Sequence, residues 1–428
     1  MRFKKLIIFI IEFIFLLLFF TNSTYATNNV SLDLSAEAAI LINSKTGQII
    51  YSKNANEQRY PASTTKILTA ILAIENCDLD EKVTASYEAV MSIPSGYSNA
   101  EIRVGEQLTV QELLEVFLVH SANEAGYILA EHVSGRISEF ANLMNSKASE
   151  IGCKNTHFTN PSGLHDKEHY TTAYDLSLIA QYCMKNDTFR SIVSMPSCTI
   201  APTEKHDERY FLNTNDMLNS KSKYYDANVI GIKTGFTSQA KNCLIAGYNK
   251  NGIELISVVL GSSQTASNGL SGKFTDTKIL FEYGMNNFSN RTLATKGQII
   301  SQIKVEHASS ETENLDLILE SDVLAFLSNS LDLTVYEPDI KLNDNLSAPI
   351  AKNTVLGTVT YSIDGISYSA NLVASHDVES SAFLENILKL LFALVILFVV
   401  YELMYSSKKK KKKSKKSKNK YLYGRVKY

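Results

Sequence analysis

A serine and a lysine stand three residues apart in the segment Pro61-Ala62-Ser63-Thr64-Thr65-Lys66. The residues that follow, 67–74, are apolar on most sides of a helix, which predicts a buried helix with Ser63 in its first turn and Lys66 beside it. A serine hydroxyl is a poor nucleophile at neutral pH. A lysine can activate it if desolvation and nearby positive charge lower the lysine pKa. The segment therefore indicates covalent catalysis by Ser63 with Lys66 as its base.

This spacing alone is weak evidence, because it recurs at Ser220/Lys223, Ser238/Lys241 and Ser301/Lys304. Two further motifs strengthen it: Ser121-Ala122-Asn123 and Lys233-Thr234-Gly235 follow Ser63 along the chain. The order Ser-x-x-Lys, Ser-x-Asn, Lys-Thr-Gly resembles the active-site signature of penicillin-binding proteins and serine β-lactamases. Second copies of two motifs, at 45–47 and 369–371, break this order and are interpreted as structural.

The neighbouring residues most resemble the low-molecular-weight D-alanyl-D-alanine carboxypeptidases, over roughly residues 35–288. Four segments carry this resemblance: 60–66, 157–164, 169–176 and 231–235. The segment up to about residue 375 also resembles the second domain of that family. A cleaved signal and a C-terminal membrane anchor fit the same family.

The resemblance implies acyl transfer through a serine ester. Ser63 would attack the carbonyl between the two terminal D-alanines of a peptidoglycan stem peptide, and Lys66 would accept its proton. Ser121 would help to pass a proton to the departing D-alanine, and Asn123 would position substrate amides. β-Lactam antibiotics would act as covalent inhibitors, and no cofactor is implied.

The third motif is suited to hold the end of the substrate. Lys233 and Thr234 offer a positive charge and a hydroxyl to the terminal carboxylate, and Gly235 lets an extended peptide lie close to the strand. By the geometry of the family, the backbone N–H groups of Ser63 and Phe236 would form the oxyanion hole. Lys273 stands where relatives often have an arginine, and it keeps the positive charge but lacks the planar guanidinium.

The sequence allows three alternatives. A β-lactamase shares the acylation step but would release the drug ester quickly, and a catalytically idle protein could bind cell wall or sense β-lactams. A metal site could be built from His165, Asp166, Glu168 and His169, but the segment has no His-Glu-x-x-His motif, so no metal is expected.

The order of predicted elements indicates an α+β fold. A hairpin at 38–51, with its turn at 43–47, precedes a helical middle. There Thr109 and Glu112 resemble a capping box, and Gly135 and Gly152 are placed like helix stops. Strands follow at 229–234, 243–248 and 253–260, which predicts one antiparallel sheet with a helical cluster. Short alternating runs then predict a small all-β domain, and they are 299–305, 316–319, 333–336 and 357–363. We expect a catalytic domain at 27–288 and a small β-rich domain at 289–378.

The two ends of the chain carry targeting signals. Residues 1–26 have a basic start, an apolar stretch and a small residue at Ala26, as in a secretory signal peptide. Residues 383–405 are expected to be a transmembrane helix, with a surface-lying amphipathic helix or a buried globular helix as alternatives. Residues 406–428 would be a Lys-rich cytoplasmic tail, which places the catalytic domain on the extracytoplasmic face of the cell membrane.

Charge is distributed very unevenly along the chain. Residues 408–428 carry 12 of the 42 Lys and Arg residues and none of the 44 Asp and Glu residues. The remainder is therefore acidic, which argues against a nucleic-acid partner, whereas the basic tail can contact anionic membrane lipid. The five cysteines form no CxxC pair and are expected to be free thiols.

Overall fold

The computed structural model describes residues 30–265 and 269–422. The expected signal peptide, residues 1–26, lies outside the described residues. The described residues divide into two compact units. The first ends at Ser289 and also includes Phe326–Ser330, and the second consists of Asn290–Ala325 and the described residues from Leu331 onward.

A five-stranded antiparallel sheet forms the centre of the first unit, in the order β2-β1-β9-β8-β7. Its strands are β1 (Ala38–Asn43), β2 (Ile49–Lys53), β7 (Val229–Thr237), β8 (Lys241–Lys250) and β9 (Ile253–Ser262). β1 pairs with β9 along its whole length, from Ala38 opposite Leu260 to Asn43 opposite Leu255. The prediction that the N-terminal hairpin joins the later strands in one sheet is therefore confirmed, and β7 lies at an edge of that sheet.

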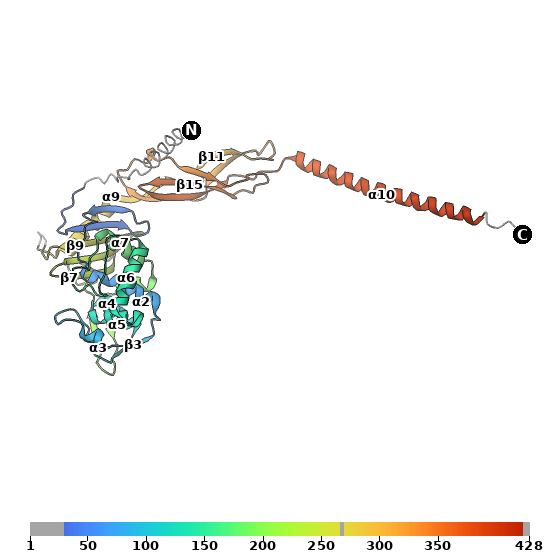
Figure 1. The fold of residues 1–428 in the computed structure, drawn as a ribbon. Coiled ribbons are helices and arrows are strands. Elements are labelled where there is room, and N and C mark those ends of the chain that lie inside the picture. The colour runs from blue at the N-terminus through green and yellow to red at the C-terminus, as the bar shows by residue number, and fades with distance from the viewer. Residues whose placement is uncertain (1–29, 266–268, 423–428) are drawn as a thin grey trace, which may run out of the picture. The chain divides into compact units, whose positions relative to one another are not determined.

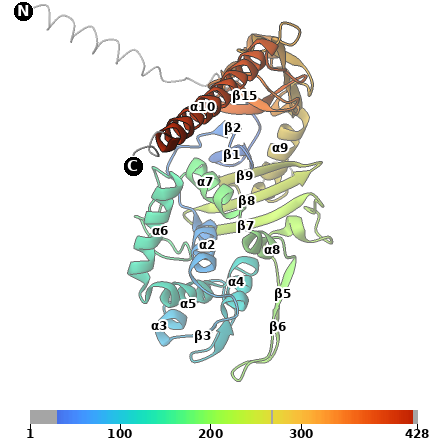
Figure 2. The same ribbon diagram turned by 90° about the vertical axis from the view of Figure 1, so that its right-hand side faces the viewer.

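Helices cover both faces of this sheet (Figure 2). The longer ones are α2 (Lys66–Asn76), α4 (Val110–Val119), α5 (Asn123–Ser134), α6 (Ile137–Ile151), α7 (Ala173–Cys183) and α9 (Gly272–Asn287). A capping box begins α4, because the Thr109 side chain accepts from Glu112 N while the Glu112 side chain accepts from Thr109 N. Shorter elements of this unit are η1 (Ala62–Thr65), β3 (Lys82–Thr84), α3 (Tyr87–Met91), β4 (Gln107–Thr109), α8 (Asp187–Val193), β5 (Ser197–Ile200), β6 (Arg209–Leu212) and η2 (Asp216–Leu218).

Two apolar cores explain why the central strands have buried side chains on both faces. Ile40 and Ile42 of β1 belong to the core shared with α2, α4 and α5. Ala39 and Leu41 point the other way, into the core beneath α9. Successive side chains of a strand face opposite sides, so a strand covered on both sides is apolar throughout. α2 is buried in the first core, which fixes the position of the residues at its start.

The second unit contains a five-stranded sheet in the order β11-β12-β16-β15-β14. The strands after α9 are β10 (Phe288–Ala294), β11 (Ile299–Lys304), β12 (Asn314–Leu319), β13 (Val323–Ser328), β14 (Asp339–Leu342), β15 (Val355–Ile363) and β16 (Ile366–Ala374). The strand expected at 333–336 is wrong, because Leu333–Val335 forms the 3-10 helix η3. Asp332 caps this turn by accepting from both the N–H and the hydroxyl of Thr334, at 2.9 and 2.7 Å.

A long helix, α10 (Ala382–Leu422), follows the last strand, β16, along the chain (Figure 1). Its portion Asn386–Lys409 is long and apolar enough to cross a membrane by length and composition. Side chains along that portion are exposed, so the structure does not place it inside a globular core. All five cysteines are free thiols, three of them buried.

Candidate active site

Ser63 and Lys66 lie at the junction of η1 and α2, one turn apart. Lys66 Nζ is 2.9 Å from Ser63 Oγ and 2.7 Å from Asn123 Oδ1. Ser63 and Asn123, from two separate motifs, therefore converge on the amine of Lys66. The burial of α2 holds the lysine in place while Ser63 remains partly exposed.

The environment of Lys66 disfavours its charged form. The side chain is fully buried, and this desolvation, with a smaller contribution from the charge of Lys233, lowers the pKa of Lys66 well below its usual value. Glu124 opposes the shift only in part. Lys66 Nζ also lies 5.5 Å from the centre of the Phe117 ring. The lowered pKa favours the neutral amine, which is the form that can act as a general base.

The Ser-x-Asn motif links α4 to α5. Asn123 donates from both its backbone N and its Nδ2 to Ser98 O, at 2.9 and 2.8 Å, so its Oδ1 is turned toward Lys66. Ser121 is buried in a left-handed conformation with φ of 71°, unusual for a residue with a side chain. Its hydroxyl makes no hydrogen bond within the described part of the chain.

The Lys-Thr-Gly motif lies in edge strand β7. Lys233 is buried, and desolvation together with the charge of Lys273 lowers its pKa to about 7. Thr234 Oγ1 is 2.7 Å from the hydroxyl of Thr214, in the segment that follows β6. A cation and a hydroxyl thus stand side by side on one strand.

Gly235 allows β7 to approach η1 closely. A Cβ placed on Gly235 would lie 3.1 Å from both Pro61 O and Ser63 N. The backbone around Ser63 N is therefore adjacent to the strand that carries Phe236. The Phe236 side chain itself is 58% exposed, so its expected contribution comes from the backbone rather than the ring.

The buried carboxylate of Glu124 directly follows Asn123 but belongs to none of the three motifs. Burial raises the pKa of Glu124, and its Oε1 accepts a hydrogen bond from Ala100 N. That bond holds the segment carrying Ser98, to which Asn123 is anchored. Its proximity to Lys66 comes from tertiary packing, for which the sequence contains no spacing signal.

A second unpredicted feature is a chain of hydrogen bonds behind Ser63. Thr159 N donates to His169 Nδ1 at 3.1 Å, so His169 carries its proton on Nε2. That nitrogen lies 2.9 Å from Thr65 Oγ1, whose own hydrogen goes to Ala62 O at 2.9 Å. Burial lowers the pKa of His169 to about 3, so the ring stays neutral. The chain holds Ala62, which has a φ of 48°, directly before Ser63.

Removing this chain is expected to slow acylation of Ser63 by penicillin. We expect about a tenfold loss for His169→Ala, because one lost buried hydrogen bond costs roughly 1 kcal/mol and leaves its partners unsatisfied. Thr65→Val should cause a similar loss, and the double variant should lose little more than either single one. Acylation rates, measured beside thermal unfolding, test this. A folded His169→Ala enzyme that acylates at the normal rate would refute the positioning role.

Comparison with known proteins agrees with this geometry. Residues 23–264 match the family model of D-alanyl-D-alanine carboxypeptidases, and residues 288–380 match that of the penicillin-binding protein 5 C-terminal domain. The chain is 32% identical over 380 residues to D-alanyl-D-alanine carboxypeptidase DacF of Bacillus subtilis, covering 86% of this chain and 93% of that protein.

Solved structures show the same likeness. Penicillin binding protein 5 from Haemophilus influenzae superposes with a TM-score of 0.61 at 28% identity, over 82% of this chain and 99% of that one. By sequence, the chain is also 32% identical to a D-alanyl-D-alanine carboxypeptidase of Streptomyces sp. strain K15, over 61% of this chain and 91% of that protein. The predicted resemblance and fold class are thus confirmed, and the chain belongs to the D-alanyl-D-alanine carboxypeptidase family of serine peptidases.

Proposed function

We propose that Ser63 is the nucleophile through which this carboxypeptidase removes the terminal D-alanine of peptidoglycan stem pentapeptides. The observation that carries the proposal is the 2.9 Å contact between Ser63 Oγ and the buried Lys66 Nζ. A neutral amine can donate to Asn123 Oδ1 and still offer its lone pair to the Ser63 hydroxyl. Lys66 therefore accepts the proton as Ser63 attacks the carbonyl between the two D-alanines.

The substrate lies along the exposed edge of β7 in this proposal. Its terminal carboxylate binds Lys233 and Thr234, and its backbone pairs with the strand beside Gly235. The N–H groups of Ser63 and Phe236 stabilise the negative oxygen of the tetrahedral intermediate. The close approach of β7 to η1 at Gly235 supports this arrangement, because it brings the two N–H groups near one another.

Ser121 and water complete the reaction. Ser121 passes the proton to the nitrogen of the departing D-alanine. Its hydroxyl is available for this step because it makes no competing hydrogen bond in the described part of the chain. Asn123 orients both Lys66 and the substrate amides. Water then hydrolyses the Ser63 ester and frees the shortened peptide. No step requires a metal or an organic cofactor.

The test of this function measures D-alanine release from a stem pentapeptide together with the lifetime of the penicillin ester. Release of D-alanine and a long-lived ester are the expected results. Rapid turnover of the drug without D-alanine release would indicate a β-lactamase instead. Intact drug together with an intact pentapeptide would indicate a catalytically idle protein that binds cell wall or senses β-lactams.

Binding of the substrate carboxylate is expected to weaken as pH rises through about 7. Lys233 loses its proton in that range, because its pKa is lowered to about 7, and a neutral amine attracts a carboxylate less strongly. The KM for an acyl-D-alanyl-D-alanine should rise by up to about tenfold between pH 6 and 8.5, an effect of roughly 1.4 kcal/mol. In Lys233→Ala the KM should be high and nearly independent of pH. A flat KM in the natural enzyme would contradict the assignment.

We further propose that α10 anchors the enzyme with its catalytic unit outside the cytoplasm. The apolar portion Asn386–Lys409 supports spanning, and the Lys-rich residues 408–428 favour a cytoplasmic tail in contact with anionic lipid. The acidic remainder of the chain makes nucleic acid an unsuitable partner. Cleavage of the secretory signal at residue 26 belongs to the same proposal.

A further inference from the structure

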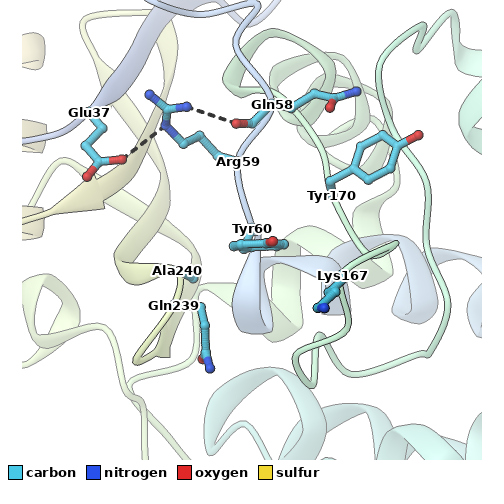
Figure 3. Close-up of a pocket in the computed structure, with 8 residues that line it drawn as sticks. All are labelled: Glu37, Gln58, Arg59, Tyr60, Lys167, Tyr170, Gln239 and Ala240. Carbon is cyan, nitrogen blue, oxygen red and sulfur yellow. Dashed lines mark hydrogen bonds and ion pairs between the residues drawn. The ribbon is translucent and has the colours of Figure 1, made fainter.

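A cavity of about 360 Å³ lies in the first unit beside Tyr60, three residues before Ser63 in the sequence (Figure 3). It is lined by Glu37, Gln58, Arg59, Tyr60, Lys167, Tyr170, Gln239 and Ala240. None of these residues belongs to the three motifs, and the chemistry proposed above uses none of them.

Each wall of the cavity continues a segment of the active site. Tyr60 precedes η1, which carries Ser63, and Gln239 and Ala240 lie in the turn between β7 and β8. The third wall, with Lys167, belongs to the loop whose Gly163 touches Ala62. The first and third walls meet where the Tyr60 ring packs edge-on against His165, at 4.7 Å between centroids.

The proposed direction of the substrate leads to this cavity. The terminal carboxylate lies at Thr234 and the reacting carbonyl at Phe236, so the peptide runs on past Thr237 toward Gln239. Extended residues advance about 3.3 Å each along a strand. The residue before the two D-alanines therefore reaches the turn between β7 and β8, which forms one side of the cavity.

Of the two cationic side chains that line the cavity, Arg59 has acidic partners and Lys167 has none among the described residues. Arg59 pairs with Glu37 at 3.2 Å and with Glu57 at 2.7 Å, and Glu37 also pairs with Lys241. Lys167 is exposed and makes no ion pair with any residue of 30–265 or 269–422. The carboxylate of the adjacent Asp166 is partly engaged in another contact, because its Oδ1 accepts a hydrogen bond from Glu168 N at 2.7 Å. Lys167 is the group available to a ligand, and it favours an anion.

We propose that this cavity is a specificity subsite for a side-chain carboxylate on the stem-peptide residue that precedes D-alanyl-D-alanine. The proposal rests on the proposed function and deepens it. Lys167 contacts the carboxylate, while the Tyr60 ring and Gln239 flank the aliphatic part of the side chain. An exposed ion pair contributes up to about 1 kcal/mol, so the expected preference is modest, about fivefold.

The test compares two peptides, acyl-X-D-alanyl-D-alanine, in which X has a straight side chain ending in a carboxylate or in the matching carboxamide. The natural full-length enzyme should cleave the carboxylate peptide with about fivefold higher kcat/KM. Lys167→Ala should abolish the difference and Lys167→Glu should reverse it, while cleavage of the carboxamide peptide stays within about twofold in both. Lys154→Ala, an exposed lysine outside the cavity, is the matched control and should retain the preference.

The other outcomes separate the two claims. Equal cleavage of the two peptides by the natural enzyme would overturn the subsite while leaving the carboxypeptidase function intact. So would a Lys167→Ala enzyme that keeps the preference or loses both activities equally. Failure of the natural enzyme to release D-alanine from either peptide would overturn the proposed function, and the subsite with it.

Discussion

Replacing Lys66 with alanine is expected to slow both penicillin acylation and D-alanine release by about a thousandfold or more. A positioned general base contributes roughly 10²–10⁴-fold, and Lys66 Nζ is the basic group in contact with Ser63 Oγ in the described structure. The loss should appear in kcat and in the acylation rate, because the interaction is needed in the transition state.

A second substitution separates the base from its charge. Lys66→Arg retains a positive group at the position but cannot become neutral near pH 7, so it should be almost as inactive as Lys66→Ala. Lys250→Ala, an exposed lysine at the end of β8, should acylate normally. Acylation can be followed with a fluorescent penicillin over time. Substantial activity in a folded Lys66→Arg enzyme would show that Lys66 acts through its charge.

Gly163→Ala is expected to destabilise the protein by roughly 3 kcal/mol and to impair acylation. Gly163 has a φ of 82°, and a Cβ there would lie 1.8 Å from Ala62 O. The left-handed backbone costs an alanine about 1–2 kcal/mol, and the overlap adds a further 1–3 kcal/mol. Relief of the overlap must shift Ala62, and with it the adjacent Ser63.

Gly135→Ala is the matched control for that substitution. Gly135 has a φ of 72° at the end of α5, and a Cβ there would meet nothing within 4 Å. It should incur only the backbone cost, about 1–2 kcal/mol, with normal acylation. Urea unfolding and acylation rates measure both effects. Equal destabilisation by the two substitutions, with acylation unchanged, would contradict the role of the Gly163–Ala62 contact.

Local signals account for what the sequence predicted correctly. The turn 44–47 joins β1 and β2, Thr109 and Glu112 cap α4, and Gly135 and Gly152 end helices in left-handed conformations. Each depends on residues a few positions apart, whose preferences are the same in any fold. The prediction of a strand at 333–336 was wrong because the Asp332 side chain caps a 3-10 turn there, despite the alternating pattern.

The supporting residues of the site could not be predicted in this way. Glu124 approaches Lys66 across two helices, and His169 reaches Thr65 over 104 positions. The sequence alone allows His169 as a metal ligand, whereas the structure shows both of its ring nitrogens engaged in hydrogen bonds. Such contacts depend on tertiary packing, and neither spacing nor composition records them.

The central claim is that Ser63 forms the covalent intermediate. The most direct test is the intact mass of the detergent-solubilised chain after incubation with penicillin, beside a Ser63→Ala variant treated identically. We predict one persistent adduct on the natural chain and none on Ser63→Ala. An adduct of equal occupancy on Ser63→Ala, or a natural chain that remains unmodified while the drug stays intact, would contradict the account.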